Sequence, residues 1–203
     1  MIPKEYGDFR ADILEKHGID GSDFRSFEED DKRGMGLAKN TKEEGAKNIV
    51  DIALNHPIAL IVNALGVPPV WLLELAKERG IKVGAMIGSS KHAIKQVEAG
   101  VDLLIASGTE AGGHTGEVST MVLIPEIFAA IKPYGDIPIL AAGGIMNGQQ
   151  MAASMAMGAS GAWCGSVWLT TIESELPQVM KDKMIAADSS QTVRSKSRTG
   201  KHS

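Results

Sequence analysis

Residues 101–116 read Val101-Asp102-Leu103-Leu104-Ile105-Ala106-Ser107-Gly108-Thr109-Glu110-Ala111-Gly112-Gly113-His114-Thr115-Gly116. The apolar first part is typical of a buried strand, and it leads directly into a glycine-rich loop that carries one histidine. In α/β enzymes, chemistry is placed where strands end. Glycines let the backbone approach a ligand closely, and histidine transfers protons near neutral pH. We therefore predict a functional loop with His114 as its candidate catalytic residue.

The same alternation of apolar runs and helical segments continues on both sides of this loop. The runs are continuous, as in strands buried on both faces, and the helical segments end at glycines such as Gly80, Gly100 and Gly158. Five such strand–helix units predict an α/β fold with a parallel sheet. The predicted strands are residues 58–65, 81–87, 101–106, 138–142 and 161–169, and the predicted helices are residues 70–79, 91–99, 124–131 and 149–157.

The first part of the chain departs from this pattern. Residues 1–50 are rich in charge and contain no convincing buried strand, so we expect a charged, partly helical excursion there. Two amphipathic helices are predicted, over residues 10–17 and 41–55. The second begins with Thr41 and Glu44 at the spacing of a capping box.

Residues 187–203 are polar, basic and without periodicity, so we expect an exposed tail. Residues 51–186 are then the α/β region. In a chain of 203 residues, 43% hydrophobic and 23% charged, this composition fits one soluble globular domain.

Net charge and cysteine content narrow the function classes. A net charge of −4 gives no basic surface for nucleic acid or an anionic membrane, so we expect neither partner. The single cysteine, Cys164, excludes an internal disulfide and fits a reducing compartment. No apolar run reaches the roughly 20 residues of a membrane helix, and the first residues lack the apolar centre of a signal peptide. We therefore expect a cytoplasmic protein.

Two further glycine sites accompany the last two predicted strands. Gly143 and Gly144 directly follow residues 138–142, and Gly165 and Ser166 lie in the final apolar run. The last two strands of (β/α)₈ barrels commonly form a phosphate site from loop N–H groups. The position of the two glycine sites at the last two predicted strands therefore predicts a phosphorylated cofactor or substrate. No metal site is expected because no HxxxH or CxxC spacing occurs. A dinucleotide-binding domain is not expected either, because no GxGxxG motif follows an early strand.

Three of these segments together resemble one family. Residues 108–116, 141–145 and 163–166 look like nitronate monooxygenases, formerly called 2-nitropropane dioxygenases. The resemblance extends from about residue 55 to residue 201. It implies a (β/α)₈ TIM barrel that holds non-covalent FMN. Since members of that family begin with further strand–helix units, the resemblance also implies that this chain is an incomplete barrel without the N-terminal strands.

The resemblance further implies an activity and a set of site residues. It makes His114 the active-site histidine beside the flavin, in an oxidation of alkyl nitronates by O₂ to a carbonyl compound and nitrite. Its substrates would be a small nitronate or nitroalkane and O₂, and a homo-oligomer is left open. The residues implied to bind FMN are Gly112, Gly113, Gly143, Gly144, Gly165 and Ser166.

Two alternative functions remain open. Flavin-dependent enoyl-[acyl-carrier-protein] reductases share the glycine–histidine loop and use NAD(P)H to reduce a conjugated double bond. The chain could also be an inactive fragment of the flavoprotein, or a flavin- or phosphate-binding module without turnover.

Overall fold

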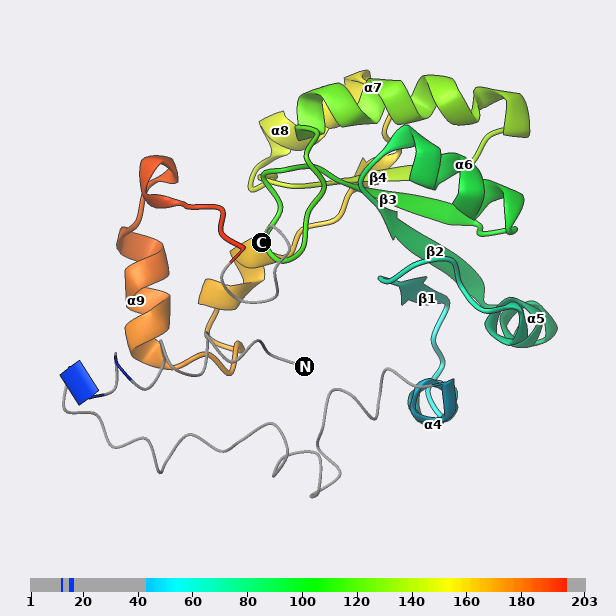
Figure 1. Cartoon of the computed structure of the whole chain (residues 1–203), viewed down its shortest axis with the longest axis horizontal. Helices are drawn as coiled ribbons and strands as arrows, with labels where there is room; N and C mark the ends of the chain where they lie inside the picture. Colours follow the sequence, from blue (N-terminus) through cyan, green and yellow to red (C-terminus); the bar gives the residue numbers. More distant parts are fainter. Residues whose placement is uncertain (1–11, 13–14, 17–42, 197–203) are drawn as a thin grey trace. The chain divides into compact units, whose positions relative to one another are not determined.

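The computed structural model describes residues 12, 15–16 and 43–196 (Figure 1). The chain divides into two compact units, residues 1–58 and residues 59–203. Within the described ranges, no helix combines the length and apolar character that crossing a membrane requires.

The first unit contains helix α4 (Glu43–Ala53). Glu43 and Lys47 form an ion pair of 2.7 Å one turn apart, which supports the start of this helix. The helix confirms the second of the two predicted amino-terminal helices. The predicted capping box at Thr41, and almost all of the helix predicted over residues 10–17, lie outside the described residues.

The second unit is built on a sheet of five parallel strands in the order β1-β2-β3-β4-β5. Strands adjacent in sequence are therefore adjacent in the sheet, as in the wall of a (β/α)₈ barrel. On the central strand, Leu104 is paired with Ala85 on one side and Ile139 on the other. The strands are β1 (Leu60–Asn63), β2 (Lys82–Ile87), β3 (Leu103–Ser107), β4 (Ile139–Ala142) and β5 (Gly161–Ala162).

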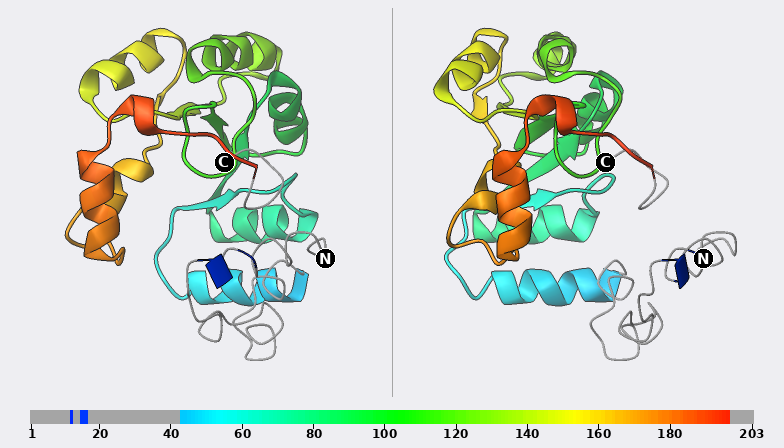
Figure 2. Two further views of the ribbon diagram at one scale, coloured as in Figure 1. Left: turned by 60° about the vertical axis from the view of Figure 1, so that its left-hand side comes forward. Right: turned by 90° about the vertical axis from the view of Figure 1, so that its left-hand side faces the viewer.

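Helices connect the strands, and α6 and α7 lie side by side over the sheet (Figures 1 and 2). Local chemistry sets their ends: Ser89 caps α6 by accepting the N–H of His92, and Gly80 ends α5 in the left-handed conformation at φ 67°. The helices are α5 (Val70–Arg79), α6 (Ser90–Glu98), α7 (Thr120–Ile131), α8 (Gly148–Ala156) and α9 (Gln178–Ala186), with 3₁₀ turns η2 (Lys132–Tyr134), η3 (Ser166–Thr170) and η4 (Ser189–Gln191).

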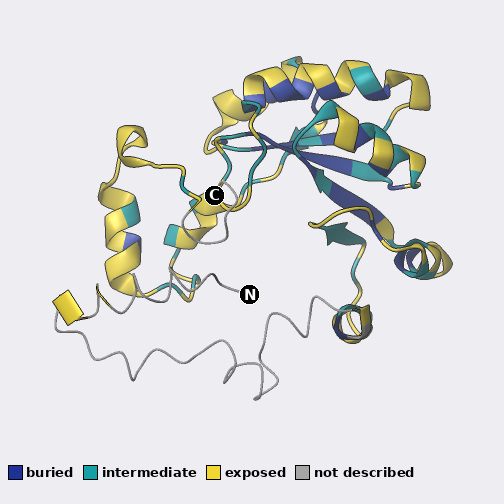
Figure 3. Cartoon of the chain, in the orientation of Figure 1, coloured by how far each residue is buried: buried dark blue, intermediate teal, exposed yellow. Residues whose placement is uncertain are grey.

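The core lies between the sheet and these helices. Leu104 and Ile139 on the strands and Ile124 and Ile127 on α7 are fully buried in one apolar cluster. Figure 3 shows α7 dark on the side that faces the sheet and yellow on its outer side. Each such side chain contributes about 1.5–3 kcal/mol of burial free energy. This core holds the carboxyl ends of the strands, where the candidate site lies, in fixed positions.

The prediction of a strand over residues 161–169 is wrong for most of its length. The strand β5 covers only Gly161–Ala162, and Ser166–Thr170 form the 3₁₀ turn η3. The apolar run does not report burial here, because Trp168 is 61% exposed. The strand ends at Ala162, and Gly165, the residue before η3, has φ −119° and ψ −73°.

The other predicted strands and helices are confirmed, with shifted ends. The largest shift is in α7, which begins at Thr120 instead of residue 124. Met121 and Val122 in this first turn are apolar although they are exposed, so the helical spacing of apolar residues does not mark the start of α7.

Candidate functional site

The loop after β3, residues 108–119, begins between the end of strand β4 and the first turn of helix α7. The N–H of Gly108 donates to the carbonyl oxygen of Ala142 at the end of β4, at 2.9 Å. A Cβ on Gly108 would overlap both the hydroxyl and the backbone of Thr120. Only glycine therefore fits where the loop leaves the sheet and passes the first turn of α7.

Glu110 fixes the loop to α7. Its Oε2 accepts hydrogen bonds from the N–H and the hydroxyl of Thr120, at 2.9 and 2.8 Å, and from the hydroxyl of Thr109 at 3.2 Å. Ser119, at the N-cap, makes no side-chain capping bond, so Glu110 supplies the acceptor for this helix end.

The environment of Glu110 also lowers its pKa. Burial raises the pKa of this carboxyl, but the hydrogen bonds from Thr120 and Thr109 favour the charged form and outweigh burial, so the pKa lies below its ordinary value. Glu110 is therefore a carboxylate at neutral pH. A negative charge is also stabilised at the start of a helix by the helix dipole.

The glycine pair after β4 meets the same loop. Gly143 has φ 125°, and a Cβ on it would lie 2.6 Å from the Thr120 hydroxyl and 3.1 Å from the backbone nitrogen of Ala111. Gly144 has φ 66°, and a Cβ there would lie 3.2 Å from Cβ of Glu110. The glycine pair after β4 thus lies in close contact with the loop after β3 and with Thr120, and a side chain on Gly143 would have no room there.

The N-terminus of α8 follows this glycine pair. The side chain of Gln150 accepts the N–H groups of Met146 and Asn147, at 2.8 and 3.2 Å, and donates to the Gly144 carbonyl oxygen at 2.7 Å. These bonds fix the loop between β4 and α8. They also engage two N–H groups near the helix start, so an anion would rely on the remaining N–H groups of the two glycine sites.

Ser166, the first residue of η3, also lies at this site. A Cβ on Gly112 would lie 2.5 Å from the Ser166 hydroxyl, so the first residue of η3 lies directly against the loop after β3. The Cβ positions of Gly113 and Gly165 face open space, with no atom within 4 Å. Backbone at Gly113 and Gly165 is therefore accessible to a ligand.

His114 lies exposed in this loop, between Gly112 and Gly116. A Cβ on Gly116 would lie 2.7 Å from the Gly88 carbonyl oxygen, so the loop after β2 touches the residues after the histidine. In addition, Nη2 of Arg194 donates to the Gly116 carbonyl oxygen at 3.0 Å. The structure thus brings the predicted site residues to one end of the sheet, around the loop that carries His114.

Sequence reasoning did not include Thr120 or Arg194 in this site, and it gave Glu110 no defined role. A threonine at the start of an apolar helix and an arginine in a polar terminal segment carry no distinguishing signal in the sequence. The glycine-rich context of Glu110 only indicates that it lies near His114 in the chain.

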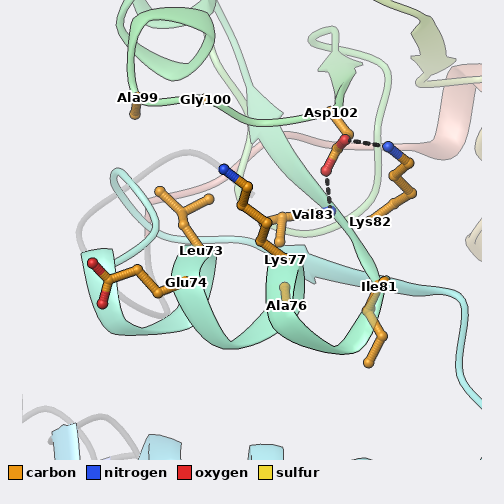
Figure 4. A pocket seen from close by; sticks show the side chains of 11 residues that line it. Leu73, Glu74, Ala76, Lys77, Ile81, Lys82, Val83, Ala99, Gly100 and Asp102 are labelled. Atoms are coloured by element: carbon orange, nitrogen blue, oxygen red, sulfur yellow. Dashed lines mark hydrogen bonds and ion pairs between the residues drawn. The ribbon is translucent and has the colours of Figure 1, made fainter.

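A cavity of about 560 Å³ lies at the opposite end of the sheet, near the starts of β2 and β3 (Figure 4). It is lined in part by Lys77, Lys82 and Asp102. Asp102 accepts hydrogen bonds from Nζ of Lys82 at 2.7 Å and from the N–H of Val83 at 2.8 Å. Because residues at this end of a barrel serve stability rather than catalysis, we assign the cavity no part in the site.

In the part of the chain that the structure describes, no group of three or more His, Cys, Asp or Glu side chains could hold a metal ion. The site is made mainly of glycine backbone, one histidine and hydroxyl groups. Such a set suits a ligand with a phosphate or another anionic group.

Consecutive parallel strands with glycine loops at their carboxyl ends define a protein of the (β/α)₈ barrel type. A family model described as nitronate monooxygenase matches residues 26–203. The chain belongs to the nitronate monooxygenase family.

Similar proteins agree with this assignment. Rv1533 of Mycobacterium tuberculosis, which is named as a monooxygenase, is 50% identical over 99% of this chain and 52% of its own length. A probable nitronate monooxygenase of Staphylococcus saprophyticus is 34% identical over 79% of this chain and 47% of its own length. The chain therefore spans about half the length of the curated relatives it matches.

Two solved structures share the fold. FabK from Thermotoga maritima has a TM-score of 0.69 and 32% identity, over 78% of this chain and 49% of that chain. The nitroalkane oxidase from Streptomyces ansochromogenes has a TM-score of 0.69 and 28% identity, over 79% of this chain and 48% of that chain.

Proposed function

We propose that this site serves the FMN-dependent oxidation of alkyl nitronates by O₂ to a carbonyl compound and nitrite. The observation that carries the proposal is the meeting of Gly112, Gly144 and Ser166, from three separate strand ends, around the loop of His114. Membership of the nitronate monooxygenase family supports it, as does the likeness to a solved nitroalkane oxidase.

The residues present fit a flavin mononucleotide. Gly143 and Gly144 adopt positive φ values. Side chains at these positions would meet Thr120 and Glu110, so the end of β4 is lined by backbone. Together with Gly165 and Ser166, their N–H groups would hold the phosphate, and the open backbone at Gly113 would border the ring. When bound, FMN supplies the electron acceptor for the substrate and the reductant for O₂.

His114 would act on the substrate. It would donate a hydrogen bond to an oxygen of the anionic nitronate, or remove the α-proton from a neutral nitroalkane as a general base. The bonds of Glu110 to Thr120 and the contact of Gly112 with Ser166 fix the loop on which His114 sits. A fixed loop lowers the entropy cost of placing the imidazole at the reacting atoms.

The test is the flavin spectrum of the purified protein, loaded with FMN and mixed without oxygen with propyl-2-nitronate or with NADH. Nitronate alone should bleach the flavin, and admission of O₂ should then release nitrite. Flavin that nitronate leaves oxidised would contradict the proposal.

The second candidate is FMN- and NAD(P)H-dependent reduction of an enoyl-[acyl-carrier-protein]. FabK and the nitroalkane oxidase match this chain with the same TM-score, so the fold alone does not choose the reaction. Rapid bleaching by NADH, with no bleaching by nitronate, would favour this second reaction. A colourless protein that retains no FMN would favour a fragment without turnover.

A further inference from the structure

Gly116, two residues after His114, is held by two segments that are distant in sequence. The loop after β2 lies against it, since a Cβ on Gly116 would be 2.7 Å from the Gly88 carbonyl oxygen. Nη2 of Arg194 donates to the Gly116 carbonyl oxygen at 3.0 Å and to the Thr115 hydroxyl at 3.4 Å. The backbone on the carboxyl side of the histidine is therefore contacted by the Gly88 backbone and by two exposed hydrogen bonds from Arg194.

A built turn directs Arg194 to this position. Asp188 accepts hydrogen bonds from the hydroxyl and the N–H of Ser190, and these bonds hold the pKa of Asp188 below its ordinary value. They close η4 (Ser189–Gln191), after which the chain is extended at Thr192. Figure 1 shows this segment, in red, returning from α9 toward the loop after β3.

The chemistry of arginine suits the contact. A hydrogen bond from a guanidinium to a carbonyl oxygen is charge-assisted and stronger than one between neutral groups. The two N–H groups on Nη2 can donate to the carbonyl and to the hydroxyl at the same time, because the planar guanidinium holds them in fixed directions. A lysine ammonium directs its N–H groups less strictly. The contact joins residues 78 positions apart, so it opposes movement of the whole loop segment.

We propose that Arg194 is a positioning residue for His114, and that the terminal segment carrying it forms part of the site. The backbone on the amino side of the histidine is fixed where Gly112 meets Ser166. Arg194 fixes the carboxyl side, so the imidazole is held between two anchored points. This inference rests on the proposed function, since it takes His114 as the group that meets the substrate.

The experiment compares R194Q and R194K with the matched control K196Q, an exposed cation in the same segment. Hydrogen–deuterium exchange of the peptide covering residues 111–117 is measured on the flavin-free protein. R194Q should exchange faster than the wild type in this peptide, R194K should lie between them, and K196Q should match the wild type. The variant T115V removes only the longer of the two hydrogen bonds and should have a smaller effect than R194Q.

Nitronate oxidation by the FMN-loaded protein is the second readout. R194Q should lower kcat by roughly ten- to hundredfold because the imidazole is misplaced, with KM changed much less. R194K should recover part of that loss, and K196Q should keep the wild-type values. Partial rescue by lysine separates positioning from a loss of folding, which the unfolding temperature of each variant checks.

Different results would contradict the proposed nitronate oxidation and the proposed role of Arg194. Faster exchange in R194Q together with no nitronate oxidation by any variant would remove the proposed function and keep the anchoring of the loop. Normal exchange and normal kcat in R194Q, in a protein that oxidises nitronate, would overturn the role of Arg194.

Discussion

Thr120 and Glu110 form the joint between the loop of His114 and helix α7. Both donors of Thr120, its N–H and its hydroxyl, point to the same carboxylate oxygen of Glu110, at 2.9 and 2.8 Å. The Thr120 hydroxyl also lies 3.4 Å from the Gly143 carbonyl oxygen, so the joint reaches the glycine pair after β4. One buried threonine therefore connects the loop that carries His114, helix α7 and the glycine pair after β4.

Replacing Glu110 with Gln should destabilise the protein by about 1 kcal/mol at neutral pH. Bonds to charged acceptors are worth more than this, but the exposure of Glu110 reduces their net value. Chemical denaturation of wild type and E110Q measures the difference. The exposed Glu117 in the same loop offers the control E117Q, which should stay within about 0.5 kcal/mol of the wild type.

The effect of Glu110 should depend on pH with a defined sign. Because the folded pKa is lowered, its stabilisation is fully present above the ordinary value of 4.5 and is lost as pH falls through the folded pKa. The difference in unfolding free energy between wild type and E110Q should therefore shrink as pH falls below about 4.5. A difference that stays constant between pH 7 and pH 3 would refute this assignment.

Replacing Gly143 with Ala should destabilise the protein by about 2–3 kcal/mol. The new Cβ would need φ 125° and would lie 2.6 Å from the Thr120 hydroxyl. Gly148, with open space around its Cβ position, is the matched site: G148A should be neutral or stabilising by up to about 1 kcal/mol. Thermal unfolding of both variants tests the pair, and equal losses would contradict the steric explanation.

The buried Lys181 should be required for the segment between η3 and α9. Its Nζ donates to the carbonyl oxygens of Thr171 and Ser174, at 2.8 and 2.7 Å. K181M keeps most of the apolar stem but leaves both carbonyls without this donor, so we expect a loss of about 1–3 kcal/mol. K183M changes an exposed lysine on the same helix and should alter stability by less than about 0.5 kcal/mol.

Replacing His114 with Asn should leave FMN binding intact and lower nitronate turnover by roughly 10²- to 10⁴-fold, the usual share of general acid–base catalysis. Flavin titration and nitrite release measure the two properties separately. Unchanged nitrite release by H114N would remove this histidine from the chemistry.

The strand positions could be predicted from the sequence because long apolar runs report burial on both faces of a parallel sheet. The same reasoning failed at residues 161–169, where Trp168 is apolar yet exposed and the chain turns at Gly165. Apolar character identifies a strand only when the residues are in fact covered.

The sequence predicts the glycines and the histidine of the candidate site, and their roles stay predictions, whereas the contacts that hold them could not be predicted. Glycine at a strand end indicates close approach, and Gly112 and Gly143 do lie against neighbouring segments. Their partners, Ser166 and Thr120, come from other turns of the chain, and Arg194 lies 78 residues from its acceptor. Such contacts leave no periodicity in the local sequence, so they become visible only once the chain is folded.

The close approach of Gly88 and Gly116 limits how the loops after β2 and β3 can be redesigned. A side chain on Gly116 would meet the Gly88 carbonyl, and one on Gly88 would lie 3.2 Å from the Gly116 Cα. Barrel enzymes acquire new substrates by exchanging individual loops on a constant frame. Here the loops after β2 and β3 can be exchanged separately only where both glycines are kept, so a mutant library that changes either position should vary both loops as a single cassette.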